Sequence, residues 1–231
     1  MFSKEVHNNA VKYVKENKKQ LLEYFAGNHI CPTQKDPISI FMAGSPGAGK
    51  TEFSKNLIKE YKLEIVRIDA DEIREQIPGY NGNNSDDVQG GSALGVEKLY
   101  DYVLKNKKSC ILDATFANFD ISRTNIQRSI RKNRPVLIYY IYQDPLIAWK
   151  FTKAREVVEG RVVPKEIFIK SFLQAKNNVN EIKKIFKENI RLNIVEKNLE
   201  NNKLENLYLN IDKIDNYLKI EYNEETLNSL L

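Results

Sequence analysis

The 231-residue chain has few of the residues on which several common classes of protein depend. Its two cysteines, Cys31 and Cys110, are too few for a disulfide framework, so a reducing compartment is the expected setting. Its two histidines, His7 and His29, lack the spacing of metal ligands. No apolar run approaches the roughly 18 residues of a membrane span, and residues 1–10 lack a signal-peptide pattern. We therefore expect a cytoplasmic protein without a membrane partner.

A large excess of charge of one sign is also absent. The chain carries 36 basic and 31 acidic residues, which gives a net charge of +5. A charge this small suits a polyanionic small molecule as well as nucleic acid, so it does not identify the partner. The length suits one packed α/β domain with an appendage, and we find no internal repeat or interdomain linker.

The most specific motif is GSPGAGKT at residues 44–51, which fits G-x-x-x-x-G-K-[ST] without a mismatch. ISIFMA (38–43) predicts a buried strand before it, and TEFSKNLIKEY (51–61) predicts a helix after it. Backbone N–H groups of such a loop surround phosphate oxygens, and the helix N-terminus adds partial positive charge. The sequence therefore predicts a nucleoside triphosphate site.

The side chains of this loop have distinct expected roles. Lys50 is expected to reach the outer phosphates, and the Thr51 hydroxyl is expected to bind Mg²⁺. The expected nucleotide-binding residues are Gly44, Ser45, Gly47, Ala48, Gly49, Lys50 and Thr51.

Acidic residues follow the next two predicted strands. Asp69 and Asp71 lie at the carboxyl end of EIVRI (64–68), where α/β sheets place their ligands. We expect one of them to cap the following helix and the other to act on a ligand, and the spacing does not decide which. Asp113 follows the third apolar strand (Cys110–Leu112) and fits the pattern of a Mg²⁺-organising carboxylate, a pattern that Asp69 fits as well.

Polar residues near these strands are further candidates. Thr115 and Asn118 follow the third strand as small hydrogen-bonding groups that could contact a substrate. Residues 79–92 are rich in glycine and asparagine and predict a loop. Residues 93–106 then predict a helix, with Glu97 near the end that faces this loop.

The second half of the chain predicts further helices and strands. Arg155 and Arg161 lie on either side of Gly160, where arginines on a mobile segment could close over phosphates. Helices are expected at 3–26, 119–132, 144–164 and 165–186, and strands at 135–142, 190–195 and 206–211.

These elements predict an α/β fold of the P-loop NTPase class, a three-layer sandwich with a mostly parallel central sheet flanked by helices, a helical lid and a small C-terminal hairpin. We expect a single domain over 1–231. Its parts are an N-terminal helix and connector (1–37), a core (38–196) with a lid around 150–164, and an appendage (197–231).

Four motifs in this order resemble the zeta-toxin family of P-loop kinases: the glycine loop, IDADEIRE (68–75), ILDATFAN (111–118) and KAREVVEGRVVPKE (153–166). The chain is similar, more distantly, to chloramphenicol phosphotransferases and polynucleotide kinases. Zeta toxins use ATP to phosphorylate the 3′-hydroxyl of UDP-N-acetylglucosamine and often pair with a small antitoxin. The resemblance therefore implies an ATP- and Mg²⁺-dependent kinase with a small-molecule acceptor and an antitoxin partner.

The resemblance also implies roles for single residues. It makes Lys50 the phosphate-binding lysine, Thr51 the Mg²⁺ ligand and Asp71 the base beside the accepting hydroxyl. It matches Arg155 and Arg161 to the two arginines that clamp the triphosphate. It places Ser92, Glu97, Asp113, Thr115 and Asn125 at substrate-side positions, and Asp113 also remains our candidate on the metal side.

Three departures from the family pattern affect the acceptor side. Asp113 replaces the usual glutamate, Ala117 stands where better-known members have an arginine against the nucleotide-sugar diphosphate, and IPGYNGNN (77–84) replaces a His-Pro-containing stretch. Loss of a charge-assisted contact to phosphate forfeits about 1.5–3 kcal/mol. We therefore expect an intact kinase apparatus and an altered acceptor pocket.

Three alternatives compete with this interpretation. The basic helix at 119–132 would suit a polynucleotide 5′-kinase, although nucleic acid is not the expected partner. A regulatory nucleotide-binding switch is disfavoured because no Asn-Lys-x-Asp motif is present. A non-catalytic partner protein is disfavoured by the complete set of lysine, acid and arginine residues.

Overall fold

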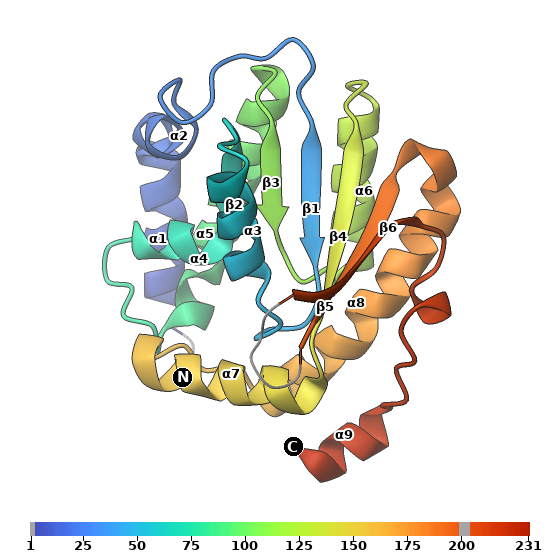
Figure 1. The fold of residues 1–231 in the computed structure, drawn as a ribbon. Helices are drawn as coiled ribbons and strands as arrows, with labels where there is room; N and C mark the ends of the chain where they lie inside the picture. Colours follow the sequence, from blue (N-terminus) through green and yellow to red (C-terminus); the bar gives the residue numbers. More distant parts are fainter. Residues whose placement is uncertain (1–2, 199–203) are drawn as a thin grey trace.

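The computed structural model describes residues 3–198 and 204–231. Its centre is a sheet with the strand order β2-β3-β1-β4-β5-β6 (Figure 1). The strands are β1 (Ser39–Ala43), β2 (Val66–Asp69), β3 (Cys110–Asp113), β4 (Val136–Tyr142), β5 (Arg191–Lys197) and β6 (Leu204–Ile211). The first five are parallel, and β6 pairs antiparallel with β5. The predicted mostly parallel sheet and C-terminal hairpin are confirmed.

Helices cover both faces of the sheet. They are α1 (Lys4–Glu16), α2 (Lys18–Ala26), α3 (Lys50–Glu60), α4 (Ala70–Glu75), α5 (Ser85–Lys105), α6 (Phe119–Ile130), α7 (Pro145–Glu159), α8 (Lys165–Phe186) and α9 (Glu224–Leu230). No helix of the described residues is both long and apolar enough to cross a bilayer.

The side chains of β1 show how the layers form. Because successive side chains of a strand point to opposite faces, β1 contributes to two cores. Phe41 and Ala43 pack in the core that contains residues of α5, α6 and α8, whereas Ile40 and Met42 pack in the core that α3 covers. All five residues of β1 are buried, as expected for a parallel strand between two helical layers. The predicted three-layer sandwich is confirmed.

The prediction of a loop over residues 79–92 is wrong from Ser85 onward, where α5 begins. The glycines of this stretch allow close helix packing instead of a turn. A Cβ atom added to Gly91 would lie 2.9 Å from atoms of Ala10 in α1, and one added to Gly90 would overlap His7. Helix α1 can therefore approach α5 only because these positions lack side chains.

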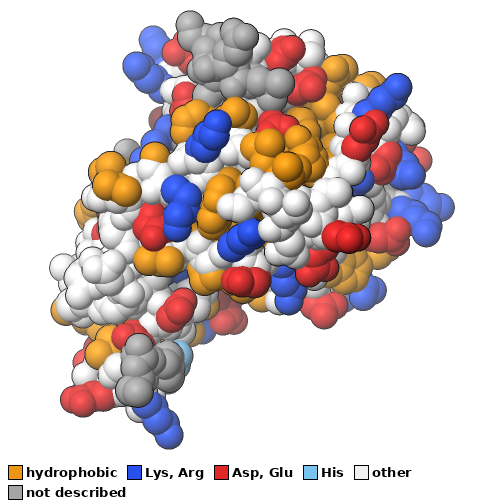
Figure 2. Space-filling model, turned by 90° about the horizontal axis from the view of Figure 1, so that it is seen from below, with side chains coloured by type: hydrophobic (Ala, Val, Ile, Leu, Met, Phe, Trp, Pro, Cys, Tyr) orange, Lys and Arg blue, Asp and Glu red, His pale blue; other side chains and the backbone are white. Residues whose placement is uncertain are grey.

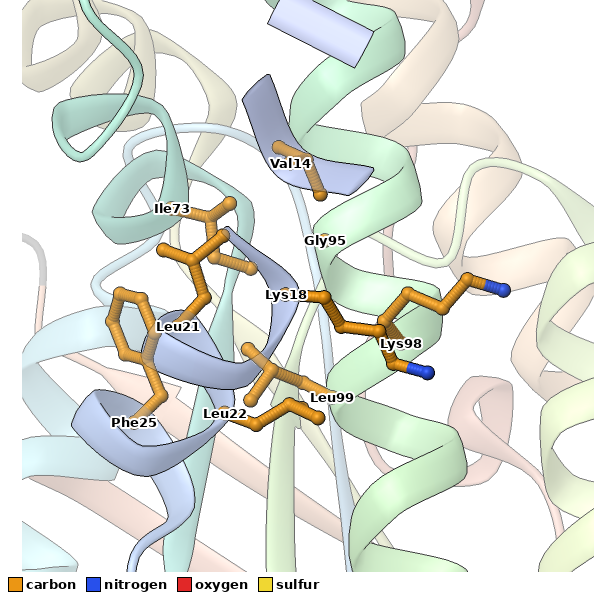
Figure 3. Close-up of a pocket in the computed structure, with 9 residues that line it drawn as sticks. All are labelled: Val14, Lys18, Leu21, Leu22, Phe25, Ile73, Gly95, Lys98 and Leu99. Atoms are coloured by element: carbon orange, nitrogen blue, oxygen red, sulfur yellow. The ribbon is translucent and has the colours of Figure 1, made fainter. Parts of the chain in front are cut away.

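The predicted N-terminal helix at 3–26 is divided into α1 and α2 at Asn17. A cavity of only 10 Å³ lies where α2 meets α4 and α5, beside Leu21, Ile73 and Leu99 (Figure 3). The side chains of Lys18 and Lys98 extend away from this apolar group. A space of this size holds about one water molecule, so it is a packing defect and not a ligand site.

Helix α7 crosses below the ends of the strands (Figure 1). Asp144 caps its N-terminus by accepting from the backbone of Leu146, and Gly160 ends it with a positive φ of 73°. The C-terminal segment packs against the base of α7. Tyr222 donates a 2.7 Å hydrogen bond to Asp144, and Leu227 of α9 is buried in the same apolar cluster as Ala148.

Candidate active site

The glycine loop at 44–51 lies between the end of β1 and the start of α3, as its sequence predicts. Its first amide, on Gly44, donates to the Thr115 carbonyl 3.2 Å away, which ties the loop to the segment after β3. Gly47 has a φ of 71°, and an added Cβ would overlap the Ala148 carbonyl of α7. The loop therefore requires glycine at this position both for its backbone conformation and for contact with the lid helix.

Lys50 lies on the inner side of this loop. Its Nζ donates to the carbonyls of Gly44, at 3.0 Å, and Ser45, at 2.7 Å. Burial lowers the pKa of Lys50 to about 8, and the nearby carboxylates of Asp113 and Asp69 oppose this change. Burial outweighs these carboxylates, so Lys50, at the position predicted for a phosphate-binding lysine, gives up its proton more readily than an ordinary lysine.

Asp113 meets the residues that follow Lys50. Ser54 Oγ donates to Asp113 Oδ2 at 3.4 Å, and the nearby Thr51 hydroxyl favours the charged form of this carboxyl and so lowers its pKa. Burial, followed by the charge of Asp69, raises the pKa of the Asp113 carboxyl. The predicted metal-side pair is thus brought together. A hydroxyl and a carboxylate are oxygen donors of the kind that Mg²⁺ prefers, so the residues present fit that ion.

Asp69 takes one of the two roles that the sequence left open, and the role of Asp71 toward a ligand stays a prediction. Asp69 caps α4, because its Oδ1 accepts the Asp71 amide hydrogen at 2.8 Å. The carboxylate of Asp71 faces three arginines. It is paired with Arg74 through Oδ1 and with Arg161 through Oδ2, and Arg155 Nη2 lies 3.8 Å from Oδ2.

The lid brings the two predicted arginines to this acid. Arg155 lies on α7 and also pairs with Glu159, a hydrogen bond that raises its pKa. Arg161 follows the end of α7 at Gly160. A Cβ added to Gly82 would overlap the Glu159 carbonyl, so the end of α7 lies directly on the loop before α5. This contact and the Arg161–Asp71 pair hold the end of α7 close to α4, which carries Asp71.

The other predicted substrate-side residues contact their own neighbourhoods. Ser92 is buried in α5, where its hydroxyl donates to the Gln89 carbonyl, and Glu97 is exposed in the middle of α5. Thr115 Oγ1 accepts from Ala117, and Asn118 caps α6 by accepting from Ile121. The Asn125 side chain accepts from Arg128 at 3.1 Å. Their roles toward a substrate stay predictions.

Sequence reasoning missed two arginines beside the acids. Arg67 is a charged residue inside the apolar strand β2 and contacts Asp69, Glu72 and Asp113. Arg74 joins Asp71 to Gln89 of α5. A charge within an otherwise apolar strand next to two acids was the available signal for Arg67.

The face below the strand ends carries mixed charge. Among its described residues, blue basic side chains alternate with red acidic ones and orange apolar ones, without a continuous basic groove (Figure 2). On α6, Arg128 is paired with Asp101 of α5. Neither the mixed charge of this face nor the paired arginine on α6 supports a long polyanion as the partner.

Comparison with known proteins gives a family match over most of the chain. The family model described as Zeta toxin matches residues 22–210. The toxin PezT of Streptococcus pneumoniae serotype 4 is 26% identical over 148 residues, which cover 58% of this chain and 58% of that toxin. The match therefore spans little more than half the length of this relative.

Two solved structures show the fold at lower identity. One, from the PezAT chromosomal toxin–antitoxin system of Streptococcus pneumoniae, has a TM-score of 0.63 at 21% identity and covers 84% of this chain and 81% of that one. The other, an AvrRxo1-ORF1:ORF2 complex with ATP, has a TM-score of 0.61 at 12% identity. The match covers 92% of this chain and 70% of that one.

Proposed function

Because this chain belongs to the zeta-toxin family of P-loop kinases, we propose that it transfers the γ-phosphate of ATP to a hydroxyl group of a nucleotide sugar, such as UDP-N-acetylglucosamine, or of a related metabolite. The observation that carries this proposal is the meeting of Asp71 with Arg155 and Arg161. These arginines come from a lid 84 or more residues away in sequence and meet the acid beside the phosphate-binding loop.

In this mechanism the Asp71 carboxylate orients the acceptor hydroxyl and takes its proton. The hydroxyl oxygen forms a bond to the γ-phosphorus while the bond to the bridging oxygen of ADP breaks. Lys50 and the loop amides hold the phosphates, and Arg155 and Arg161 turn from Asp71 to the charge that spreads over the transferred group. Lys50 follows the loop after β1, Asp71 follows the end of β2, and the two arginines reach Asp71 from α7 and from the residue after Gly160.

The metal side is assigned to two residues. The Thr51 hydroxyl and the Asp113 carboxylate would hold Mg²⁺, which supplies positive charge at the β- and γ-phosphates when bound. The acceptor side is assigned to Ser92, Glu97, Thr115, Asn118 and Asn125, and Ala117 removes a cation that better-known members use there.

A small antitoxin protein is the proposed macromolecular partner. Two of the similar proteins support it, since one solved structure comes from a toxin–antitoxin system and the other is a complex of two proteins. Binding would be measured with the product of a neighbouring small reading frame. Inhibition of phosphate transfer by that product at a one-to-one ratio is the expected result.

An acceptor screen tests the proposed reaction. Purified protein, Mg²⁺ and γ-labelled ATP are incubated with UDP-sugars, other nucleotide-linked metabolites and 5′-hydroxyl oligonucleotides, with Asp71→Asn as the matched control. Label on a nucleotide sugar, lost in the control, is the expected outcome. Label on oligonucleotides alone would replace the proposal with a polynucleotide kinase. ATP binding without transfer to any of these acceptors would contradict it.

A further inference from the structure

Arg67 contacts the carboxylates of Asp113, on the nucleotide side of the proposed site, and of Asp69, on its acceptor side. Its side chain is only 7% exposed. Its Nη1 donates to Asp69 Oδ2 and to Asp113 Oδ2, each at 2.8 Å, and its Nη2 pairs with Glu72. One guanidinium group therefore contacts three acids from β2, α4 and β3.

The sheet forces two of these acids together. Asp69 and Asp113 are register partners at the ends of the neighbouring strands β2 and β3. Both are nearly buried, with side chains 10% and 4% exposed, so their charges repel with little screening by water. Arg67 lies two residues before Asp69 and on the same face of β2, where its planar group can bridge both carboxylates. Burial disfavours the charged guanidinium, yet the carboxylates of Asp69 and Glu72 raise the pKa of Arg67 above the ordinary value.

Each of the two acids that Arg67 bridges also interacts with a different residue of the proposed reaction. Asp69 accepts the amide hydrogen of Asp71, which fixes the first turn of α4 and with it the proposed base. Thr51, which carries the proposed metal-side hydroxyl, lies close enough to Asp113 to lower the pKa of its carboxyl, against the larger effect of burial. Arg67 lies between these two connections and contacts neither Asp71 nor Thr51 in the described structure.

We propose that Arg67 is a positioning residue for phosphoryl transfer, whose guanidinium group sets the orientation of Asp113 on the nucleotide side and of Asp69, and through it Asp71, on the acceptor side. The proposal rests on the proposed kinase function. A lysine cannot replace Arg67, because its ammonium is a point charge that does not bridge carboxylates in a plane. Glu72 pairs with Lys55 and Arg67, and within the described residues it contacts neither Asp71 nor Thr51, so its contact with Arg67 serves as an internal control.

The test compares Arg67→Lys with Glu72→Gln. Binding of a fluorescent ATP analogue is measured with and without Mg²⁺, and kcat and KM are measured with the acceptor found in the screen. Loss of a group that orients metal ligands costs about 10- to 100-fold, so Arg67→Lys should lose at least tenfold of the Mg²⁺-dependent gain in nucleotide affinity. Its kcat should fall by a similar factor, with KM for the acceptor changed by less than about threefold. Glu72→Gln should change each value by less than about twofold.

Unfolding by urea separates positioning from a purely structural role. The proposal is wrong if Arg67→Lys unfolds cooperatively and keeps both the wild-type kcat and the wild-type gain in nucleotide affinity with Mg²⁺. If Arg67→Lys does not fold, the double variant Arg67→Gln with Asp69→Asn is used instead, because it removes one charge of each sign. Its kcat and its gain in nucleotide affinity with Mg²⁺ are then compared with the wild-type values. If the wild-type protein binds nucleotide but phosphorylates no acceptor, the kinase function fails, while the Mg²⁺ effect on nucleotide binding still decides the role of Arg67.

Discussion

At the scale of single residues, the proposed chemistry depends on the Asp71 carboxylate and on Arg155 and Arg161, which contact it. Asp71→Asn keeps the size of the side chain and removes its ability to take a proton. General bases contribute about 10²–10⁴ to a rate, so kcat should fall by that range. ATP affinity should not fall, because Arg155 and Arg161 lose a competing acid. Transfer assays and ATP titrations measure both values, and near wild-type transfer would show that Asp71 is not the base.

A second residue, Ala117, tests the altered acceptor side. Its carbonyl accepts a hydrogen bond from Asn178 and its amide donates to Thr115, which holds its backbone in place. If the acceptor is a nucleotide sugar, Ala117→Arg should restore a charge-assisted contact of about 1.5–3 kcal/mol to its diphosphate. KM for that acceptor should then fall at least about tenfold, with kcat little changed.

The uncharged variant Ala117→Gln is the matched control for Ala117→Arg. It has a similar reach without the charge, so its KM should stay near the wild-type value. An equal gain in both variants would mean that length and not charge improves binding, and no gain in either would place the diphosphate elsewhere.

At the scale of elements, the C-terminal segment holds the base of the lid helix α7. Tyr222 donates to Asp144, the residue that caps α7, and this hydrogen bond together with burial raises the pKa of Tyr222 to about 12. Tyr222→Phe removes only the hydroxyl. The free energy of unfolding should fall by about 1 kcal/mol. This is the usual contribution of a hydrogen bond to a charged group, reduced because the pair is partly exposed to solvent.

The pH dependence of this difference has a definite sign. Because the folded-state pKa lies above the ordinary value of 10, the stabilisation is complete below pH 10 and is lost as the pH rises through about 12. Urea unfolding of wild-type protein and Tyr222→Phe at pH 8 and at high pH measures the difference. A difference that stays constant or grows with pH would contradict the role of this hydrogen bond.

Elements also show why part of the fold escaped prediction. The glycine loop, its strand and its helix are contiguous in sequence, so the local pattern of residues is sufficient to predict them. Gly90 and Gly91 carry the usual signal of a loop, and only the packing of α1 against α5 explains why a helix contains them. Asn17 divides a periodic helix without a proline or glycine signal. Local pattern thus predicted most elements and failed where tertiary packing decided.

At the scale of the whole molecule, the site is assembled from distant segments. The family resemblance assigns the role of base to Asp71 and not to Asp69, and the hydrogen bond by which Asp69 caps α4 gives that prediction a physical reason. Arg67 escaped prediction because its importance depends on Asp113, which is 46 residues away and adjacent only through strand pairing. Spacing within one strand cannot reveal an ion pair between two strands.

The lid, the loop and the strand ends should respond together to nucleotide. A ligand that binds only the folded state stabilises it by about 2.7 kcal/mol at 100 times its Kd. For a chain of this length about 1 kcal/mol shifts Tm by roughly 2–4 °C, so saturating Mg²⁺-ATP should raise Tm by about 5–10 °C. Asp71→Asn should keep this shift, since its acid is not needed to bind phosphates. Lys50→Ala should lose most of it, because the buried amine on the inner side of the loop is removed. If Lys50→Ala shows the full shift in Tm, the triphosphate binds away from this loop. The proposed location of the whole site would then be wrong.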